Sequence, residues 1–149
     1  RKLIASPPSN SQFMPEVLFC AYRLAVADEQ HLSQAAYETW VLGNSRRIYR
    51  NFLGKLIMAF ASKRMLLDAA GSRWAMIHRG STFAARYVGE GTYEGRLDFP
   101  PHLFDEPILR GLGGVMQAAF ELVEKPGFVL KLMEFEPTWA RYETHSAPP

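Results

Sequence analysis

The hydrophobic positions of residues 104–122 recur at the spacing of a buried helix. Ile108, Leu112, Val115 and Ala119 follow one another at intervals of three or four residues, which gives one apolar stripe. Charged residues are almost absent from the middle of the segment, so most of the helix surface must face protein. The segment lies between two pairs of strand-like segments, and we expect the rest of the domain to be arranged around it.

Local signals define the start of this helix, and glycines mark its middle. Asp105 can accept hydrogen bonds from first-turn amides, and Pro107 falls where a missing N–H costs little. Gly111, Gly113 and Gly114 each cost about 1 kcal/mol relative to alanine. Tight packing against a strand or helix is the simpler explanation, and one wall of a ligand pocket is the alternative. A phosphate loop is disfavoured, because no strand leads directly into the glycines and no Lys-Ser/Thr pair follows them.

The N-terminal half has helical patterns. Residues 1–12 are rich in proline and serine and predict a flexible segment. We expect a helix over residues 15–28 that buries its apolar side. The apolar positions of that helix are Val17, Leu18, Ala21, Leu24 and Ala25. A second helix begins after Ser33, which can cap it, and Gly43 is expected to end it.

Two further helices are expected before the strands begin. Residues 45–60 have an apolar stripe on one side and basic residues on the other, which a solvated basic face explains most simply. The stripe consists of Ile48, Tyr49, Phe52, Leu53, Leu56 and Phe60. Residues 65–78 form the next helix, which Gly71 is expected to divide and Gly80 to end.

The hydrophobic period then changes to that of strands. Residues 82–88 and 92–99 flank a glycine-rich turn, which predicts a hairpin. Alternation places Tyr93, Leu97 and Phe99 on one face and charged residues on the other, so we expect one face of the sheet to be solvated.

A second hairpin completes the predicted fold. Residues 128–135 and 138–144 form its strands, with Pro137 at the break. The sequence therefore predicts an α+β fold, in which N-terminal helices precede a β-hairpin–helix–β-hairpin unit with a four-stranded antiparallel sheet. We expect a single domain over residues 13–145, followed by a tail over residues 146–149.

Composition narrows the function classes. A chain of 149 residues with 48% hydrophobic residues suits one globular domain. The net charge of +2 gives no reason to expect a nucleic-acid or membrane partner. Cys20 is the only cysteine, so no internal disulfide can form, and a reducing, cytoplasmic setting is the expectation. Because the chain begins at Arg1 rather than at a methionine, it can be a fragment of a longer protein.

Candidate catalytic or metal-binding residues do not form a recognised pattern. The four histidines lack metal-ligand spacing. His78 or His102 could be a single axial ligand, but an ordinary polar residue at the edge of the core is the favoured interpretation of each. Glu134, Glu136 and Glu143 could supply acid–base pairs in a pocket, but solvent-facing strand positions are the default. We therefore predict neither a catalytic set nor a metal, and no cofactor.

Several segments together resemble a known family. The matching segments are Leu42-Gly43-Asn44-Ser45-Arg46-Arg47, the run Leu66-Leu67-Asp68 with the later Trp74, the helix Leu109–Phe120, and Ala140-Arg141-Tyr142-Glu143. Over about residues 35–143 the chain resembles a paralogous family of uncharacterised proteins typical of myxobacteria. It is also similar to the wider superfamily of 4-vinyl-reductase, haem-NO-binding and TRAPP-type domains.

The resemblance implies a compact α+β domain that often dimerises. Relatives of this kind bind small hydrophobic molecules, porphyrin-like ligands or acyl chains, or act as sensory inputs and assembly platforms. The chain lacks the cysteines that the 4-vinyl-reductase type has near the last hairpin. It also lacks the histidine and the Tyr-x-Ser-x-Arg pattern of the haem-NO sensors. The resemblance therefore gives no reason to expect metal or haem binding by this chain.

Three functional hypotheses follow. The first is a non-enzymatic sensory or signalling domain with a pocket for a small hydrophobic ligand, between the glycine-bearing helix and the helices before the first hairpin. The expected lining residues are Phe52, Leu56, Trp74, Gly111, Gly114, Met116 and Phe120. The second is an interaction module, expected to form a homodimer or bind another protein through aromatic residues such as Tyr22, Tyr37 and Trp40. The third is an enzyme acting on a small hydrophobic substrate.

Overall fold

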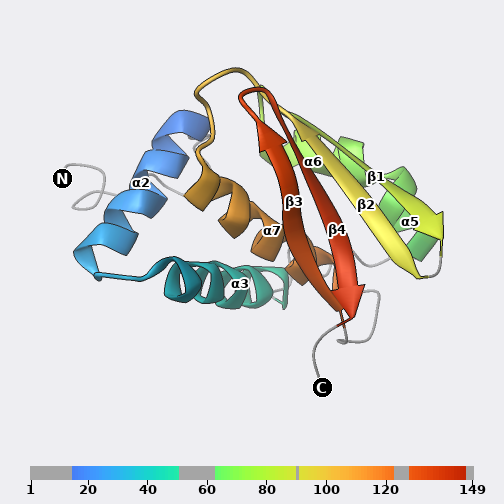
Figure 1. Cartoon of the computed structure of the whole chain (residues 1–149), viewed down its shortest axis with the longest axis horizontal. Helices are drawn as coiled ribbons and strands as arrows, with labels where there is room; N and C mark the ends of the chain where they lie inside the picture. Colours follow the sequence, from blue (N-terminus) through green and yellow to red (C-terminus); the bar gives the residue numbers. More distant parts are fainter. Residues whose placement is uncertain (1–14, 51–62, 90, 123–127, 147–149) are drawn as a thin grey trace.

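The computed structural model describes residues 15–50, 63–89, 91–122 and 128–146. The helices are α2 (Glu16–Glu29), α3 (Gln34–Arg50), α5 (Lys63–Asp68), α6 (Ala70–Ile77) and α7 (Glu106–Phe120). The strands are β1 (Thr82–Gly89), β2 (Thr92–Asp98), β3 (Phe128–Glu136) and β4 (Trp139–Ser146). This order confirms the predicted α+β fold, with N-terminal helices followed by two β-hairpins that have one helix between them (Figure 1).

The two hairpins join into one antiparallel sheet. The strand order is β1-β2-β4-β3, so the second strand of each hairpin lies in the centre of the sheet. Leu97 is paired with Ala140, and Gly95 with Tyr142. Leu97, Ala140 and Tyr142 are fully buried, because they share the face of the sheet that α7 covers. The predicted burial of Tyr93 and Phe99 beside Leu97 is also confirmed.

Helix α7 lies between the sheet and α3, as Figure 1 shows. Its start follows the local signals in the sequence, since the Asp105 side chain accepts a hydrogen bond from the Ile108 amide at 3.1 Å. On the sheet side, the Tyr142 hydroxyl donates to the Leu109 carbonyl at 2.9 Å. On the opposite side, a Cβ built on Gly114 would lie 3.4 Å from Leu42 of α3. The expectation of a buried helix at the centre of the domain is therefore confirmed.

Helix α3 is longer than predicted. The prediction that Gly43 ends one helix and that another starts near Ser45 is wrong, because α3 continues to Arg50. Tyr37, Val41 and Ser45 lie four residues apart and form its buried face, so packing along α7 offsets the roughly 1 kcal/mol cost of a glycine. Ser45 is the buried residue in this turn of α3. Ile48 was predicted to be buried and is 62% exposed instead.

Helix α2 is turned opposite to the prediction. Its buried residues are Glu16, Cys20, Arg23 and Ala27. Four of the five residues of its predicted apolar face are exposed instead: Val17 is 56% exposed, Leu18 is 41% exposed, and Ala21 and Ala25 are also exposed. Leu24, the fifth, is partly buried against the core. The orientation follows from the polar residues, because Glu16 and Arg23 contact side chains of distant elements and turn inwards with them.

The predicted division near Gly71 falls two residues earlier. Ala69 separates α5 from α6, and Gly71 lies inside α6. A Cβ on Gly71 would be 2.8 Å from the Phe83 carbonyl oxygen, so this glycine allows α6 to pack directly on the backbone of β1. In the part of the chain that is described, none of the helices has the length and apolar character needed to cross a membrane.

Candidate functional site

A cleft of about 400 Å³ lies between α2 and the start of α7. The residues that line it are Val17, Cys20, Ala21, Leu24, His102, Leu103, Phe104, Asp105 and Ile108. Most of these side chains are apolar, and the volume falls within the range of small-molecule sites. The inverted orientation of α2 contributes to this cleft, because it leaves Val17 and Ala21 exposed rather than buried.

The polar groups of the cleft lie in the segment before α7. His102 has a φ of 64°, the left-handed conformation that few residues other than glycine adopt. Asp105 is exposed and caps α7. Cys20 belongs to the wall, and burial, with a smaller contribution from the nearby Glu16 carboxylate, raises the pKa of its thiol to about 12. The thiol therefore stays protonated at neutral pH, which suits a small core residue rather than a nucleophile.

Two buried donors lie beside the cleft, where α2, α3 and α7 meet. Arg23 is 5% exposed and Tyr37 is 2% exposed, so the suggestion that Tyr37 is an exposed interface residue is wrong. Both side chains approach Gly111: a Cβ there would lie 2.9 Å from Arg23 Nη2 and 3.2 Å from the Tyr37 oxygen. Neither Arg23 Nη2 nor the Tyr37 hydroxyl has a hydrogen-bond partner among the described residues. Burial raises the pKa of Tyr37, and the Arg23 guanidinium offsets part of that shift.

A second buried polar cluster fastens α2 to α6. His78 Nδ1 lies 3.0 Å and 2.9 Å from the two carboxylate oxygens of Glu16. The His78 ring stacks on the Trp74 indole at a centroid distance of 3.8 Å, and the indole N–H donates to Ser81 Oγ at 2.9 Å. All four residues are buried. The default interpretation of His78 as a polar edge residue is therefore wrong, and its partner stands 62 positions away in the sequence.

The residues predicted to line a pocket are dispersed over the core. Gly111 faces Arg23 and Tyr37, whereas Gly114 faces Leu42. The remaining described residues of the set are buried. Trp74 stacks with His78, Met116 belongs to the core cluster, and the ring centre of Phe120 lies 6.0 Å from that of Tyr93. Phe52 and Leu56 lie outside the described residues. None of the five described residues is among those that line the cleft between α2 and α7.

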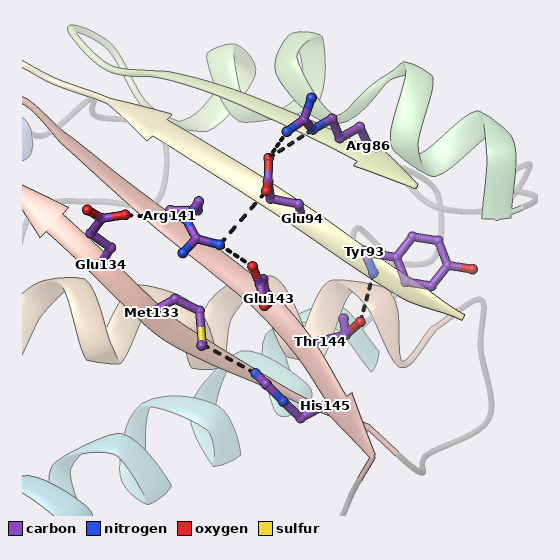
Figure 2. A network of polar contacts seen from close by, with 9 residues as sticks. All are labelled: Arg86, Tyr93, Glu94, Met133, Glu134, Arg141, Glu143, Thr144 and His145. Carbon is purple, nitrogen blue, oxygen red and sulfur yellow. Dashed lines mark hydrogen bonds and ion pairs between the residues drawn. The ribbon is translucent and has the colours of Figure 1, made fainter. Parts of the chain in front are cut away.

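The outer face of the sheet carries an ionic network, shown in Figure 2. Arg86 donates to Glu94 at 2.8 Å, and Arg141 lies 3.9 Å from the other Glu94 oxygen. Arg141 also contacts Glu143 and lies 3.6 Å from Glu134. The prediction of a solvated second face is thus confirmed. Glu134 and Glu143 meet an arginine on this face and do not line the cleft.

A second hollow lies on another part of the domain. A hollow of about 650 Å³ beside β1 is lined by Leu67, Asp68, Ala85, Arg86, Tyr87, Gly91 and Tyr93. It is larger than the cleft between α2 and α7, and its wall includes the charged Asp68 and Arg86. Within the described ranges, no three histidine, cysteine or acidic residues are placed to hold a metal ion.

Searches of protein-family models, curated proteins and solved structures found no match to this chain.

Proposed function

We propose that this domain binds a small, mainly apolar molecule in the cleft between α2 and α7, and that it serves as a sensory or signalling module. The observation that carries the proposal is the cleft itself, which is about 400 Å³ in volume and has polar groups in a single wall segment. Apolar walls with a few fixed polar groups are typical of sites for small ligands. The resemblance to the 4-vinyl-reductase and haem-NO-binding superfamily agrees with this proposal.

The position of α2 supports a signalling role. This helix forms one wall of the cleft and has an exposed apolar surface, so a ligand that contacts Val17 and Ala21 would change how α2 is held. A ligand that binds one arrangement of α2 better than another shifts the population towards it. A reducing, cytoplasmic setting is part of the same proposal.

The cleft can be tested with a substitution that fills it. Ala21 is exposed and lines the cleft, so Ala21→Trp would occupy the site without disturbing the buried side of α2. Ala25→Trp is a matched control, because Ala25 is exposed one turn further along the helix and is not a lining residue. Binding of 1-decanol, measured by calorimetry, should weaken at least about tenfold in Ala21→Trp and remain unchanged in Ala25→Trp. Equal binding by both variants, or none by the unmodified protein, would exclude the cleft as the site.

A second candidate function is self-association through the outer side of α2. The observation that favours it is that Val17, Leu18 and Phe19 are 56%, 41% and 38% exposed, while the polar Glu16 and Arg23 are buried. Contiguous exposed apolar surface is typical of interaction sites. Small residues at Ala21 and Ala25 would allow a second helix to approach closely.

We propose a second copy of this chain as the occupant, because the charges on α2 suit an antiparallel pair. The exposed acidic residues Asp28 and Glu29 lie at the C-terminal end of α2, which is the negative end of the helix dipole. In a two-fold antiparallel pair, each acidic end would lie near the positive N-terminal end of the partner helix.

Sedimentation at high protein concentration tests this second candidate. Leu18→Glu should convert a dimer to a monomer, because it introduces two carboxylates into an apolar interface. Ile48→Glu is the control, since Ile48 is 62% exposed on α3 rather than α2. A monomeric unmodified protein, or a dimer that Leu18→Glu leaves intact, would rule out pairing through α2.

A further inference from the structure

The Arg23 guanidinium is buried without a described acceptor for one of its nitrogen atoms. Its Nη2 lies at the contact between α2 and α7, 2.9 Å from the position of a Gly111 Cβ. The guanidinium carbon lies 5.5 Å from the Phe19 ring centre and 5.6 Å from that of Tyr37. Such cation–π contacts stabilise the charge but provide no hydrogen-bond acceptor. A buried charge without full hydrogen bonding is costly, so an external acceptor would be strongly favoured here.

Two acidic residues of the same region, Glu16 and Asp105, have other hydrogen-bond partners. Both carboxylate oxygens of Glu16 contact His78. The Asp105 carboxylate caps α7 by accepting from the Ile108 amide. Neither residue supplies the acceptor for Arg23 Nη2 in the described structure. By hydrogen-bond geometry, the Tyr37 hydroxyl is a second buried group without a partner among the described residues at the same place.

These donors lie next to the apolar cleft. Arg23 follows the lining residue Cys20 by three positions on α2, and Gly111 follows the lining residue Ile108 by three positions on α7. Residues three apart share one side of a helix. Gly111 has no side chain to separate the donors from each other, since a Cβ there would approach both. Arg23 and Tyr37 do not line the cleft themselves, and one helical turn separates Arg23 from the lining residue Cys20.

We propose that Arg23 and Tyr37 recognise an oxyanion, and that the ligand of the cleft is an amphipathic carboxylate. Its apolar chain lies between α2 and α7, and its carboxylate accepts from Arg23 Nη2 and the Tyr37 hydroxyl. This inference rests on the proposed ligand-binding function and adds the chemical class of the ligand. Arginine suits this role, because its planar guanidinium matches the geometry of a carboxylate.

The experiment compares decanoate with 1-decanol, which have equal chain lengths and differ in the charged head group. Binding to the full chain is measured by calorimetry at about pH 8, where the carboxylate is ionised. Decanoate should bind at least about tenfold more tightly than decanol, since hydrogen bonds to charged groups are stronger than neutral ones. Arg23→Met should remove this preference, because it weakens decanoate binding more than decanol binding. Arg47→Met, at an exposed position on α3, is the control and should retain the preference.

The outcomes distinguish the proposed apolar cleft from the proposed oxyanion site. Decanol binding without a preference for decanoate, or a preference that persists in Arg23→Met, would overturn the oxyanion site and leave the apolar cleft in place. Failure of both compounds to bind would overturn the cleft together with the inference that rests on it.

Two further measurements keep the test valid if Arg23→Met affects folding. Tyr37→Phe removes one oxygen atom only and should lower the preference for decanoate about threefold. Ligand-free Arg23→Met should melt at a higher temperature than the unmodified protein, because it removes a buried charge that lacks a full set of partners. A lower melting temperature would indicate that an acceptor inside the protein already satisfies Arg23, which contradicts the proposal.

Discussion

Gly111 and Gly113 stand two residues apart on α7 and have different reasons to be glycine. A Cβ on Gly111 would lie 2.9 Å from both Arg23 Nη2 and the Tyr37 ring, which is closer than side-chain contacts allow. A Cβ on Gly113 would lie 3.5 Å from the Leu130 carbonyl oxygen and 3.6 Å from the Tyr142 ring, which are ordinary contacts. The helix therefore needs glycine at the first position for space and tolerates a methyl group at the second.

Alanine substitutions at the two positions should have opposite effects on stability. Gly113→Ala should raise the free energy of unfolding by about 0.5–1 kcal/mol, because alanine favours the helix and meets no clash. Gly111→Ala should lower it by about 1–3 kcal/mol, since the buried Tyr37 ring must move. Urea denaturation of both variants measures the difference. A stabilised Gly111→Ala would show that this contact is loose.

Helix α2 buries a polar pair, Glu16 with His78, beside the small core residues Cys20 and Ala27. Glu16 and His78 are each 8% exposed at the side chain, with their nearest atoms 2.9 Å apart. Removing one partner of such a pair leaves the other buried and uncompensated. Glu16→Gln or His78→Gln should therefore cost about 3 kcal/mol in the free energy of unfolding.

A double-mutant cycle distinguishes this pair from two independent contributions. The variant Glu16→Leu/His78→Leu should lose much less stability than the sum of the two single leucine variants, because no unpaired polar group remains. Thermal or urea unfolding of all four proteins gives the coupling free energy. Additive losses would mean that Glu16 and His78 do not depend on each other.

The contrast between α7 and α2 shows how far the sequence predicts the elements. The signals for α7 are local: Asp105 caps it, Pro107 fits the first turn, and Ile108 and Leu112 lie on one stripe. The orientation of α2 depends on contacts with residues far along the chain, since His78 is 62 positions from Glu16. Hydrophobic periodicity predicts a buried apolar face and carries no information about such a polar partner.

The candidate site was harder to predict than the fold for the same reason. The prediction located a pocket between the glycine-bearing helix and the helices before the first hairpin, whereas the residues that line the cleft come from α2, the start of α7 and the segment before it. The lining residues could not be derived, because they depend on which side of α2 faces outwards and on the segment that contains His102. The glycines correctly indicated close approach at α7, but the contacting group at Gly111 is a polar pair that periodicity does not reveal.

Helix α3 packs on α7 through buried side chains such as Val41 and also through an ion pair. The inner face of the sheet is apolar, with Leu97 and Ala140 fully buried. The layer of α3 is fastened to the end of α7 by Arg46, which donates to both carboxylate oxygens of Glu121 at 2.7 Å. The two parts should therefore respond differently to acid.

The pKa of Glu121 determines how the stability of the helical layer changes with pH. The hydrogen bonds from Arg46 lower the pKa of Glu121 below its ordinary value of 4.5. A carboxylate whose pKa is lower in the folded state stabilises the fold fully above its unfolded pKa, and this stabilisation is lost as the pH falls through the folded pKa. Because the Arg46 side chain is 40% exposed and thus screened by solvent, we expect a contribution of about 1 kcal/mol at neutral pH.

Glu121→Gln should therefore lower the free energy of unfolding by about 1 kcal/mol at pH 7 and by almost nothing below the folded pKa of Glu121. Asp98→Asn is the control: its pair with Arg96 is about half exposed on both sides, so the loss should be smaller at any pH. Hydrogen exchange on acidification should show α3 losing protection before β2 and β4, because the link to α7 titrates and the apolar face of the sheet does not. Simultaneous loss in helix and sheet would mean that the domain unfolds as one cooperative unit, with the Arg46–Glu121 pair contributing to all of it.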